Sequence, residues 1–163
     1  MDTKQIFFML YTGKGDKGTT KTFGAKERIP KSSLVIDALG SVDEINSFLG
    51  LCKVKAQEAG HRVGSNGKLF SRIVHDVQKD LFIIQAELAG AGKHITKTKV
   101  TKLEKIIADI EKEIPPIKTF FIGGGTELTA LFDVARTFVR RAERCLVAAA
   151  QGEEIKIGKN TYA

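Results

Sequence analysis

The sequence predicts an all-α protein that folds as an up-and-down helical bundle. Four stretches carry apolar residues every three or four positions, glycine-rich segments connect them, and the alternating pattern of strands is scarce. The 163 residues, 42% of them apolar, correspond to about one domain with a buried core. We expect no internal repeat and no second domain. A glycine-rich segment is expected over residues 1–31 and the bundle over residues 32–163.

The predicted helices have recognisable boundaries. The first begins after Pro30, with Ser32 or Ser33 as its cap. The third begins at Thr101, whose spacing to Glu104 matches a capping box. In chain order the helices are predicted over about 33–59, about 70–88, from 101 to the prolines at 115 and 116, and about 126–151.

The segments between the helices show no helical period. A short apolar stretch, Ile6–Tyr11, precedes a loop over residues 12–31 that is rich in glycine, lysine and threonine. Lys118–Ile122 is compatible with a short strand and leads into three consecutive glycines, Gly123–Gly125. These glycines suit a turn, a hinge or the close approach of a flat ligand.

Charge and cysteine content limit the class of protein. The 26 lysines and arginines outnumber the 19 aspartates and glutamates, and the net charge of +7 suits an anionic partner such as nucleic acid, a phosphorylated small molecule or a membrane surface. No apolar run approaches the ~20 residues of a membrane span, so we expect no membrane partner. Two cysteines cannot form a disulfide framework, which favours a cytoplasmic protein.

The glycine-rich loop has the composition of a phosphate-binding segment. Gly13, Gly15 and Gly18 satisfy a GxGxxG pattern, but no helix opens at Gly18, and Thr19 stands where a P-loop would have lysine. Glycines let backbone N–H groups approach a ligand closely, and the neighbouring lysines and threonines add charge and donors. A flexible, solvated basic loop is the alternative.

Arginines line one side of the fourth predicted helix. Arg136, Arg140 and Arg144 recur at four-residue intervals with Glu143 among them, and Arg141 lies on the flank. Like charges at this spacing repel each other unless an anion lies opposite, and the planar guanidinium binds carboxylates and phosphates with two hydrogen bonds. The stripe therefore predicts an anion site, with a solvated helix face as the alternative.

A second polar stripe lies on the first predicted helix. Gly40, Asp43, Ser47 and Gly50 share one face, where small residues permit close packing. Asp43 is the available counter-charge for an arginine, either to stabilise the fold or to serve the site.

Five motifs in order, spread over almost the whole chain, resemble those of one enzyme family. They are Tyr-Thr-Gly-Lys-Gly-Asp-Lys-Gly-Thr-Thr at 11–20, Pro-Lys at 30–31, Ala-Leu-Gly-Ser-Val-Asp-Glu-Ile-Asn-Ser at 38–47, Val-Gln-Lys-Asp-Leu-Phe at 77–82, and Ala-Arg-Thr-Phe-Val-Arg-Arg-Ala-Glu-Arg at 135–144. Together they resemble the ATP:cob(I)alamin adenosyltransferase family. The resemblance implies a five-helix bundle that forms a homotrimer, with ATP bound between neighbouring subunits.

The resemblance also implies roles for individual residues, with residues 1–31 as the nucleotide-binding segment. Arg136 resembles an arginine that pairs with Asp43 across the subunit interface, and Phe120 resembles an aromatic that lies beside the corrin and displaces the lower axial ligand of cobalt. With Arg140, these form the expected catalytic set. The residues matched to ATP binding are Thr12, Gly13, Lys14, Gly15, Thr20, Lys21, Lys31, Arg140, Arg141, Glu143 and Arg144.

Two positions and one motif depart from the family pattern. Gly123 stands where the family usually has proline, and Asp133 stands where histidine is common. An Asn-Arg-Leu-Ser-Asp motif, whose asparagine contacts the nucleotide, is expected after Tyr162 but is not part of this sequence.

The implied reaction transfers the 5′-deoxyadenosyl group of ATP to cob(I)alamin and releases triphosphate. Cobalt(I) is already a strong nucleophile, so the protein supplies orientation and stabilises the charge of the leaving group. Mg²⁺ is expected on the ATP phosphates, with no metal site on the protein itself, and an electron donor is needed to reduce cobalt. One alternative is a non-enzymatic basic bundle that binds RNA, although we expect no nucleic-acid partner; another is a structural trimer that has lost catalysis.

Overall fold

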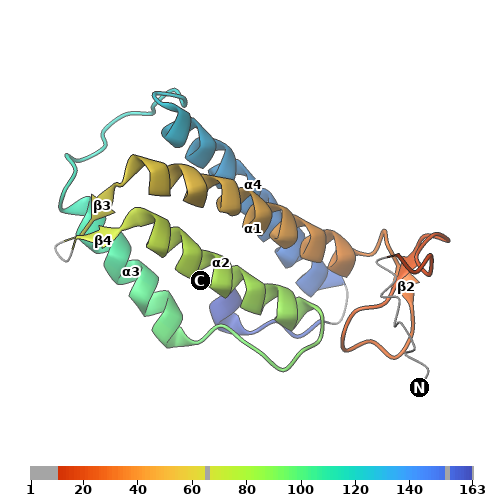
Figure 1. Cartoon of the computed structure of the whole chain (residues 1–163). Helices are drawn as coiled ribbons and strands as arrows, with labels where there is room; N and C mark the ends of the chain where they lie inside the picture. The colour runs from red at the N-terminus through yellow and green to blue at the C-terminus, as the bar shows by residue number, and fades with distance from the viewer. Residues whose placement is uncertain (1–10, 65–66, 153–154, 163) are drawn as a thin grey trace, which may run out of the picture.

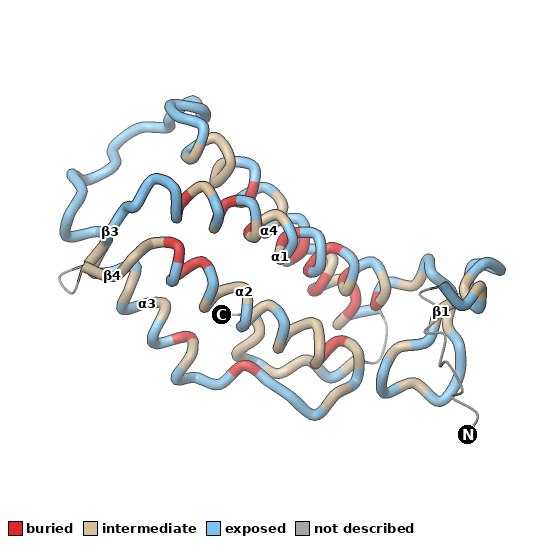
Figure 2. Tube along the Cα trace, viewed as in Figure 1, coloured by how far each residue is buried: buried red, intermediate tan, exposed pale blue. Residues whose placement is uncertain are grey.

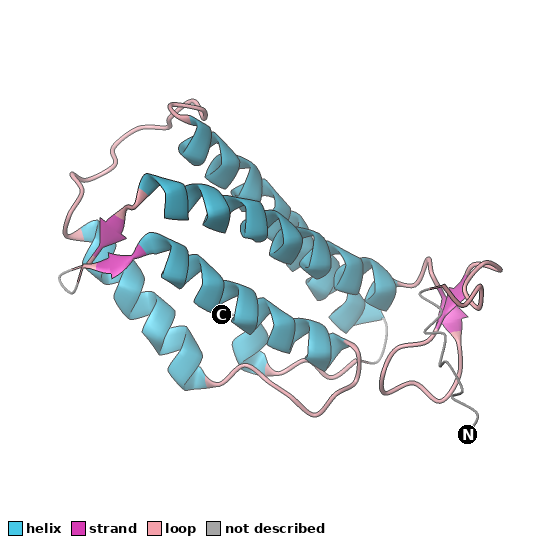
Figure 3. Cartoon of the chain, viewed as in Figure 1, coloured by secondary structure: helices cyan, strands magenta, loops and turns pink. Residues whose placement is uncertain are grey.

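The computed structural model describes residues 11–64, 67–152 and 155–162. Over these ranges the chain is mostly helical, with two small antiparallel sheets (Figure 1, Figure 3). The helices are α1 (Leu34–Ala59), α2 (Phe70–Leu88), α3 (Lys97–Glu111) and α4 (Glu127–Gly152), followed by a 3-10 turn, η1 (Lys159–Thr161). The strands are β1 (Thr19–Thr20), paired with β2 (Ile29–Pro30), and β3 (Arg62–Val63), paired with β4 (Lys68–Leu69).

The predicted helical bundle is confirmed, with α1 at its centre, because α2 and α4 both pack along this helix (Figure 1). Val42, Ile45 and Cys52 of α1 are almost completely buried. Figure 2 shows the buried positions gathered where α1, α2 and α4 meet. Burial of a side chain such as Ile45 stabilises the fold by about 1.5–3 kcal/mol. Within the described ranges, none of the helices has the length and apolar content needed to cross a membrane.

The observed helix ends correct part of the prediction. Helix α1 begins directly after Ser33, as expected, although the Ser33 side chain makes no capping hydrogen bond. Helix α3 begins at Lys97, with Thr96 in the N-cap position, so the predicted start at Thr101 is wrong. Thr101 and Glu104 have capping-box spacing but lie inside the helix, because buried Val100 extends the apolar stripe by a turn.

The segment after α3 differs from the prediction as well. Helix α3 ends at Glu111, earlier than the prolines require. Lys118–Ile122 forms no strand and is exposed along its length, since no neighbouring extended segment pairs with it. The fifth helix that the family resemblance implies has no counterpart in the described part of the chain, where η1 alone follows α4.

The glycine-rich N-terminal loop is more ordered than its composition suggests. The β1–β2 pair closes it, and the Lys31 amide donates to the Gly18 carbonyl at 2.9 Å. At the far end of the loop, the Gly24 amide donates to the Ala89 carbonyl at 2.8 Å, so the loop is attached to the end of α2. Gly24 and Gly90 lie so close that a Cβ on Gly24 would lie 2.8 Å from the Gly90 oxygen. Most of the apolar stretch Ile6–Tyr11 lies outside the described residues.

The C-terminal segment, residues 155–162, is held to α2 by a buried carboxylate. The Glu87 side chain is 2% exposed. It accepts hydrogen bonds from the Gly158 amide (2.6 Å) and the Thr161 hydroxyl (2.7 Å), and its Oε1 lies 2.8 Å from His94 Nδ1. Burial raises the pKa of Glu87, but the bonds from Thr161, Gly158 and His94 together outweigh it and leave the pKa below its ordinary value.

Asp76 of α2 joins three elements through ion pairs. Its carboxylate accepts from Lys68 of β4 at 2.9 Å and from Lys102 of α3 at 3.2 Å. The hydrogen bond from Lys68 is the main cause that lowers the pKa of Asp76 to about 2, burial opposes the shift, and Lys102 adds to it. This carboxylate therefore helps to hold α3 against α2.

The lowered pKa of Asp76 makes the stability of the fold dependent on pH. Because the pKa is lower in the folded state, the contribution of the carboxylate is fully present above its unfolded value of 3.8 and is lost as pH falls toward about 2. We expect Asp76→Asn to lower the free energy of unfolding more at pH 5 than at pH 2, measured by urea denaturation. Glu111→Gln, which changes an exposed carboxylate of α3, is the control. If the free energy of unfolding differs between Asp76→Asn and wild type by the same amount at both pH values, the lowered pKa of Asp76 is contradicted.

The contact between Gly24 and Gly90 predicts a steric effect of one methyl group. Gly24→Ala would force the N-terminal loop away from α2, with an expected loss of about 1–3 kcal/mol of stability and faster proteolysis within residues 21–28. Gly92→Ala is the matched control, since its Cβ would meet no atom within 4 Å and its backbone is not left-handed. Thermal unfolding and limited proteolysis measure both effects. Identical behaviour of the two variants would show that the contact carries no constraint.

Candidate functional site

A hollow of about 510 Å³ lies where the β1–β2 pair, the start of α1 and the end of α2 meet. Its walls combine a cation, a hydroxyl, a carboxylate, an amide and apolar side chains. The lining residues are Thr20, Lys31, Ile36, Leu39, Gly40, Asp43 and Gln85. Gly40 leaves room in the wall, because no neighbouring atom lies within 4 Å of the place that a Cβ would take. Such a mixture suits a ligand that has both an anionic and a flat, less polar part.

A second hollow of about 450 Å³ adjoins the first, on the side of α1 that faces α4. The two hollows share Lys31, Ile36 and Gly40. The remaining lining residues of the second hollow are Asp37, Ser41, Glu44, Arg141 and Cys145. Lys31 therefore borders both spaces, and the second one adds a guanidinium.

Lys31 is also the residue that brings the glycine-rich loop to the hollows. A Cβ on Gly15 would lie 3.2 Å from the Lys31 ammonium and 3.3 Å from its Cε, so the lysine side chain runs directly along the Gly15 backbone. The structure thus brings together three predicted residues: Gly15 lies against Lys31, and Lys31 and Thr20 line the same hollow. Lys14, Lys21 and Thr12 are exposed on the same loop.

Asp43 lies in the first hollow but has a partner that the sequence analysis did not identify. Gln85 Nε2 of α2 donates to Asp43 Oδ1 at 2.9 Å. Arg136, its expected partner, is exposed on α4, and among the ion pairs of the described residues none joins these two side chains within one chain. Gln85 lies beside the uninterrupted apolar stripe of α2, and no signal in the sequence marks it as a partner of Asp43.

Of the α4 arginines, Arg141 is the one that reaches the second hollow. It forms an ion pair with Glu44 of α1, and its guanidinium lies 5.1 Å from the centre of the Phe138 ring. Glu44 was not predicted as a site residue, although it follows Asp43 directly. Helix α1 therefore presents Asp43 to the first hollow and both Asp37 and Glu44 to the second.

The other predicted α4 residues point in different directions around the helix and do not converge on one hollow. Arg140 and Arg144 are exposed, and Arg144 Nη1 donates to the Arg140 carbonyl at 3.0 Å. Glu143 lies on a different side, in a hollow of about 230 Å³ between α1, α2, α4 and the C-terminal segment, where Tyr162 is a neighbour. The predicted stripe is therefore one face of exposed arginines with Arg141 and Glu143 to either side.

Phe120 lies far from the hollows within one protomer. It belongs to the long connection between α3 and α4, at the opposite end of the bundle from the β1–β2 pair (Figure 1), and its side chain is fully exposed. From the start of α4 to Arg141 the helix rises about 20 Å. The chain thus carries the predicted anion-binding residues and the predicted aromatic at two separate ends.

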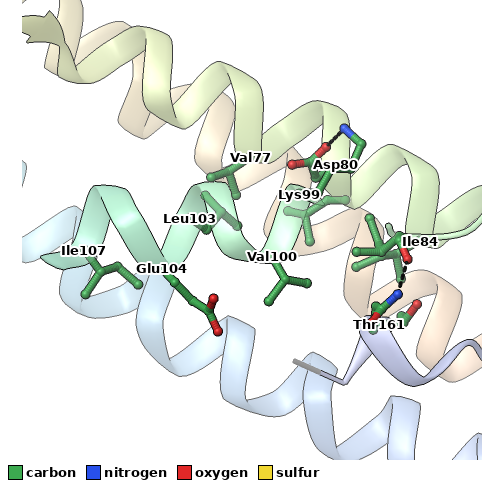
Figure 4. Close-up of a pocket in the computed structure, with 12 residues that line it drawn as sticks. Val77, Asp80, Ile84, Lys99, Val100, Leu103, Glu104, Ile107 and Thr161 are labelled. Carbon is green, nitrogen blue, oxygen red and sulfur yellow. Dashed lines mark hydrogen bonds and ion pairs between the residues drawn. The ribbon is translucent and has the colours of Figure 1, made fainter. Parts of the chain in front are cut away.

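A fourth space lies away from all predicted site residues. This groove of about 240 Å³ runs between α2, α3 and η1 and is lined mainly by aliphatic side chains such as Leu103 and Ile107, with the Asp80–Lys99 ion pair in its wall (Figure 4). Within the described ranges, no group of three histidine, cysteine, aspartate or glutamate side chains is arranged to hold a metal ion.

Comparison with known proteins identifies relatives along almost the entire chain. The model of the cobalamin adenosyltransferase family matches residues 10–162. A corrinoid adenosyltransferase of Citrobacter freundii is 36% identical over 148 residues, which are 86% of this chain and 78% of that protein. A corrinoid adenosyltransferase of Bacillus subtilis (strain 168) is 35% identical over 157 residues, 90% of this chain and 74% of that protein.

A solved structure shares the fold. It is a variant PduO-type ATP:corrinoid adenosyltransferase from Lactobacillus reuteri complexed with cobalamin and ATP, with a TM-score of 0.79 and 28% identity, covering 94% of this chain and 81% of that one. Fold, sequence identity and family match agree, and the chain belongs to the cobalamin adenosyltransferase family.

Proposed function

We propose that this protein transfers the 5′-deoxyadenosyl group of ATP to cob(I)alamin. The cobalt–carbon bond forms as the bond between C5′ and the triphosphate oxygen breaks, and the electron pair of that bond leaves with triphosphate. The observation that carries the proposal is that Lys31, Thr20 and Asp43 line one hollow, with the Gly15 backbone against Lys31, in a member of this family. Relatives bear the name corrinoid adenosyltransferase, and a related structure holds both ATP and cobalamin.

The proposed ATP site uses the N-terminal segment, residues 1–31, whose described part, residues 11–31, lies at the end of the bundle. Lys31 is suited to the phosphates, because its ammonium lies against the glycine-rich backbone and borders both hollows. The other proposed nucleotide contacts are Thr12, Gly13, Lys14, Gly15, Thr20, Lys21, Arg140, Arg141, Glu143 and Arg144. Mg²⁺ belongs to this proposal as a companion of the ATP phosphates, where it spreads the charge of the leaving group.

The chemistry assigned to the protein is electrostatic. Triphosphate gains negative charge as it leaves, and fixed cations aimed at it lower the barrier. Cob(I)alamin needs no general base, so the residues of the site orient the two substrates and exclude water. An external electron donor that reduces cobalt completes the proposed cycle.

A homotrimer with sites between subunits explains the separation of the predicted residues. Phe120 and the hollows lie at opposite ends of one protomer, so a single chain cannot bring the aromatic to the nucleotide. In the proposed assembly, Arg136 of one subunit pairs with Asp43 of its neighbour, whose Oδ1 already accepts from Gln85. The RNA-binding alternative leaves the convergence of Lys31, Thr20 and Asp43 without a role.

Loss of cob(I)alamin absorbance on addition of Mg-ATP tests the reaction, and Lys31→Ala tests the site. One charge-assisted hydrogen bond to the leaving triphosphate is worth a roughly ten- to hundredfold change in rate, so we expect kcat/KM to fall by about that factor. Lys26→Ala removes an exposed lysine of the same loop that lines neither hollow, and should behave as wild type. Equal activity of the two variants would refute the role of Lys31.

Phe120→Ala tests whether this residue acts on cobalamin and not on ATP. The variant should keep the thermal stabilisation by Mg-ATP but react more slowly when cob(II)alamin and a reductant are supplied, because the axial ligand of cobalt is no longer excluded. Ile117→Ala removes another exposed apolar side chain of the α3–α4 connection, outside residues 120–122, and is the control. If Phe120→Ala weakens ATP binding as much as it slows the reaction, the assigned role is wrong.

A further inference from the structure

The connection between α3 and α4 presents apolar side chains to solvent. Phe120 and Ile122 are fully exposed, and Phe121 is 75% exposed. Three adjacent exposed apolar residues mark a surface that contacts another apolar body. Such a surface serves binding only when the backbone that carries it has a defined conformation, since ordering a loose loop costs free energy at the moment of binding.

A carboxylate of α4 holds this loop. The Gly124 amide donates to Asp133 Oδ2 at 3.0 Å. Gly124 has a φ of +98°, a left-handed conformation that glycine adopts without strain. The two residues directly after the apolar side chains, Gly123 and Gly124, are therefore the point at which the loop is fastened to the helix.

Gly123 is shaped to the same carboxylate. A Cβ at position 123 would lie 2.7 Å from Asp133 Oδ2 and 3.0 Å from its Cγ, so the carboxylate occupies the space that any larger residue needs. Gly123 itself is not in a left-handed conformation. A larger residue at position 123 is therefore disfavoured by its contact with Asp133 and not by backbone strain. Asp133 and the glycine pair thus fit one another through a hydrogen bond and a close contact.

The helix that carries Asp133 is itself fixed at its start. Thr126 and Thr129 bond reciprocally: the Thr129 amide donates to Thr126 Oγ1 at 3.2 Å, and the Thr126 amide donates to Thr129 Oγ1 at 2.8 Å. This arrangement caps the first turn of α4 and places Asp133 in the turn that follows. The carboxylate that fastens the loop therefore belongs to a helix whose first turn is capped.

We infer that Asp133 is a positioning residue that holds the Phe120–Ile122 loop in the conformation that receives the corrinoid. The inference rests on the proposed function. Asp133 acts through the Gly124 amide and touches neither substrate. Its effect falls on the corrinoid side of the reaction, because the hollows that we assign to ATP lie at the other end of the protomer.

The test compares Asp133→Ala with Asp133→Asn in steady-state kinetics. Asp133→Ala removes the acceptor, and we expect the KM for cobalamin to rise by about tenfold while the KM for ATP and the midpoint of thermal unfolding stay near wild type. Asp133→Asn keeps an oxygen that accepts the same N–H, so it should restore most of the cobalamin affinity. If Asp133→Ala changes both KM values alike, or if Asp133→Asn is as defective as Asp133→Ala, the inference is overturned.

A double-mutant cycle with Gly123→Ala tests the fit from the other side. Gly123→Ala should displace the carboxylate and raise the cobalamin KM by a similar factor. Because Asp133→Ala removes the oxygen that the new methyl group meets, the double variant should be no worse than Asp133→Ala alone. If the rise in cobalamin KM of the double variant equals the product of the two single rises, the residues act separately and the inference is refuted.

Amide hydrogen exchange at Gly124 distinguishes failure of the inference from failure of the proposed function. Exchange should be faster in Asp133→Ala than in wild type, and unchanged exchange would overturn the anchoring itself. A wild-type protein with a protected Gly124 amide but no ATP-dependent consumption of cob(I)alamin would instead reject the proposed reaction, and with it the corrinoid role of the loop.

Discussion

The burial of α1 between α2 and α4 is the constraint on which the rest of the molecule depends. Once Val42, Ile45 and Cys52 are enclosed, the helical period turns Asp43 and Glu44 away from the core and toward the hollows. The core and the candidate site are thus two faces of one helix. A rotation of α1 that moved the carboxylates would also expose the apolar stripe, so the packing free energy of the bundle holds the site in register.

The polar residues around α1 are organised by contacts between distant parts of the chain. Gln85 of α2 orients Asp43, and Arg141 of α4 pairs with Glu44. An exposed ion pair contributes little to stability, about 0–1 kcal/mol, so its main effect is to set the direction of the charges. The molecule consequently has a preformed polar end, and the exposed apolar loop before α4 gives the other end a different chemical character.

Sequence patterns predicted the helices well, because apolar periodicity reports directly on which side of a helix is buried. They failed where a local pattern had an alternative explanation: Thr101 and Glu104 have the spacing of a capping box yet lie inside α3. Contacts between residues that are not adjacent in the sequence could not be predicted either. Nothing near Gln85 in the sequence names Asp43 as its partner, and the Asp133 carboxylate beside Gly124 depends on how the loop folds back.

The last turn of α2 and the residue directly after it hold both chain-terminal arms of the described structure. Glu87 binds the C-terminal segment through Gly158, and Ala89, two residues later, binds the N-terminal loop through Gly24. Fraying of this short stretch would break both hydrogen bonds at once, although the two arms are far apart in the sequence. The two arms therefore share one anchoring stretch, and its opening would also withdraw Ile155 and Ile157 of the C-terminal arm from the core against which they pack.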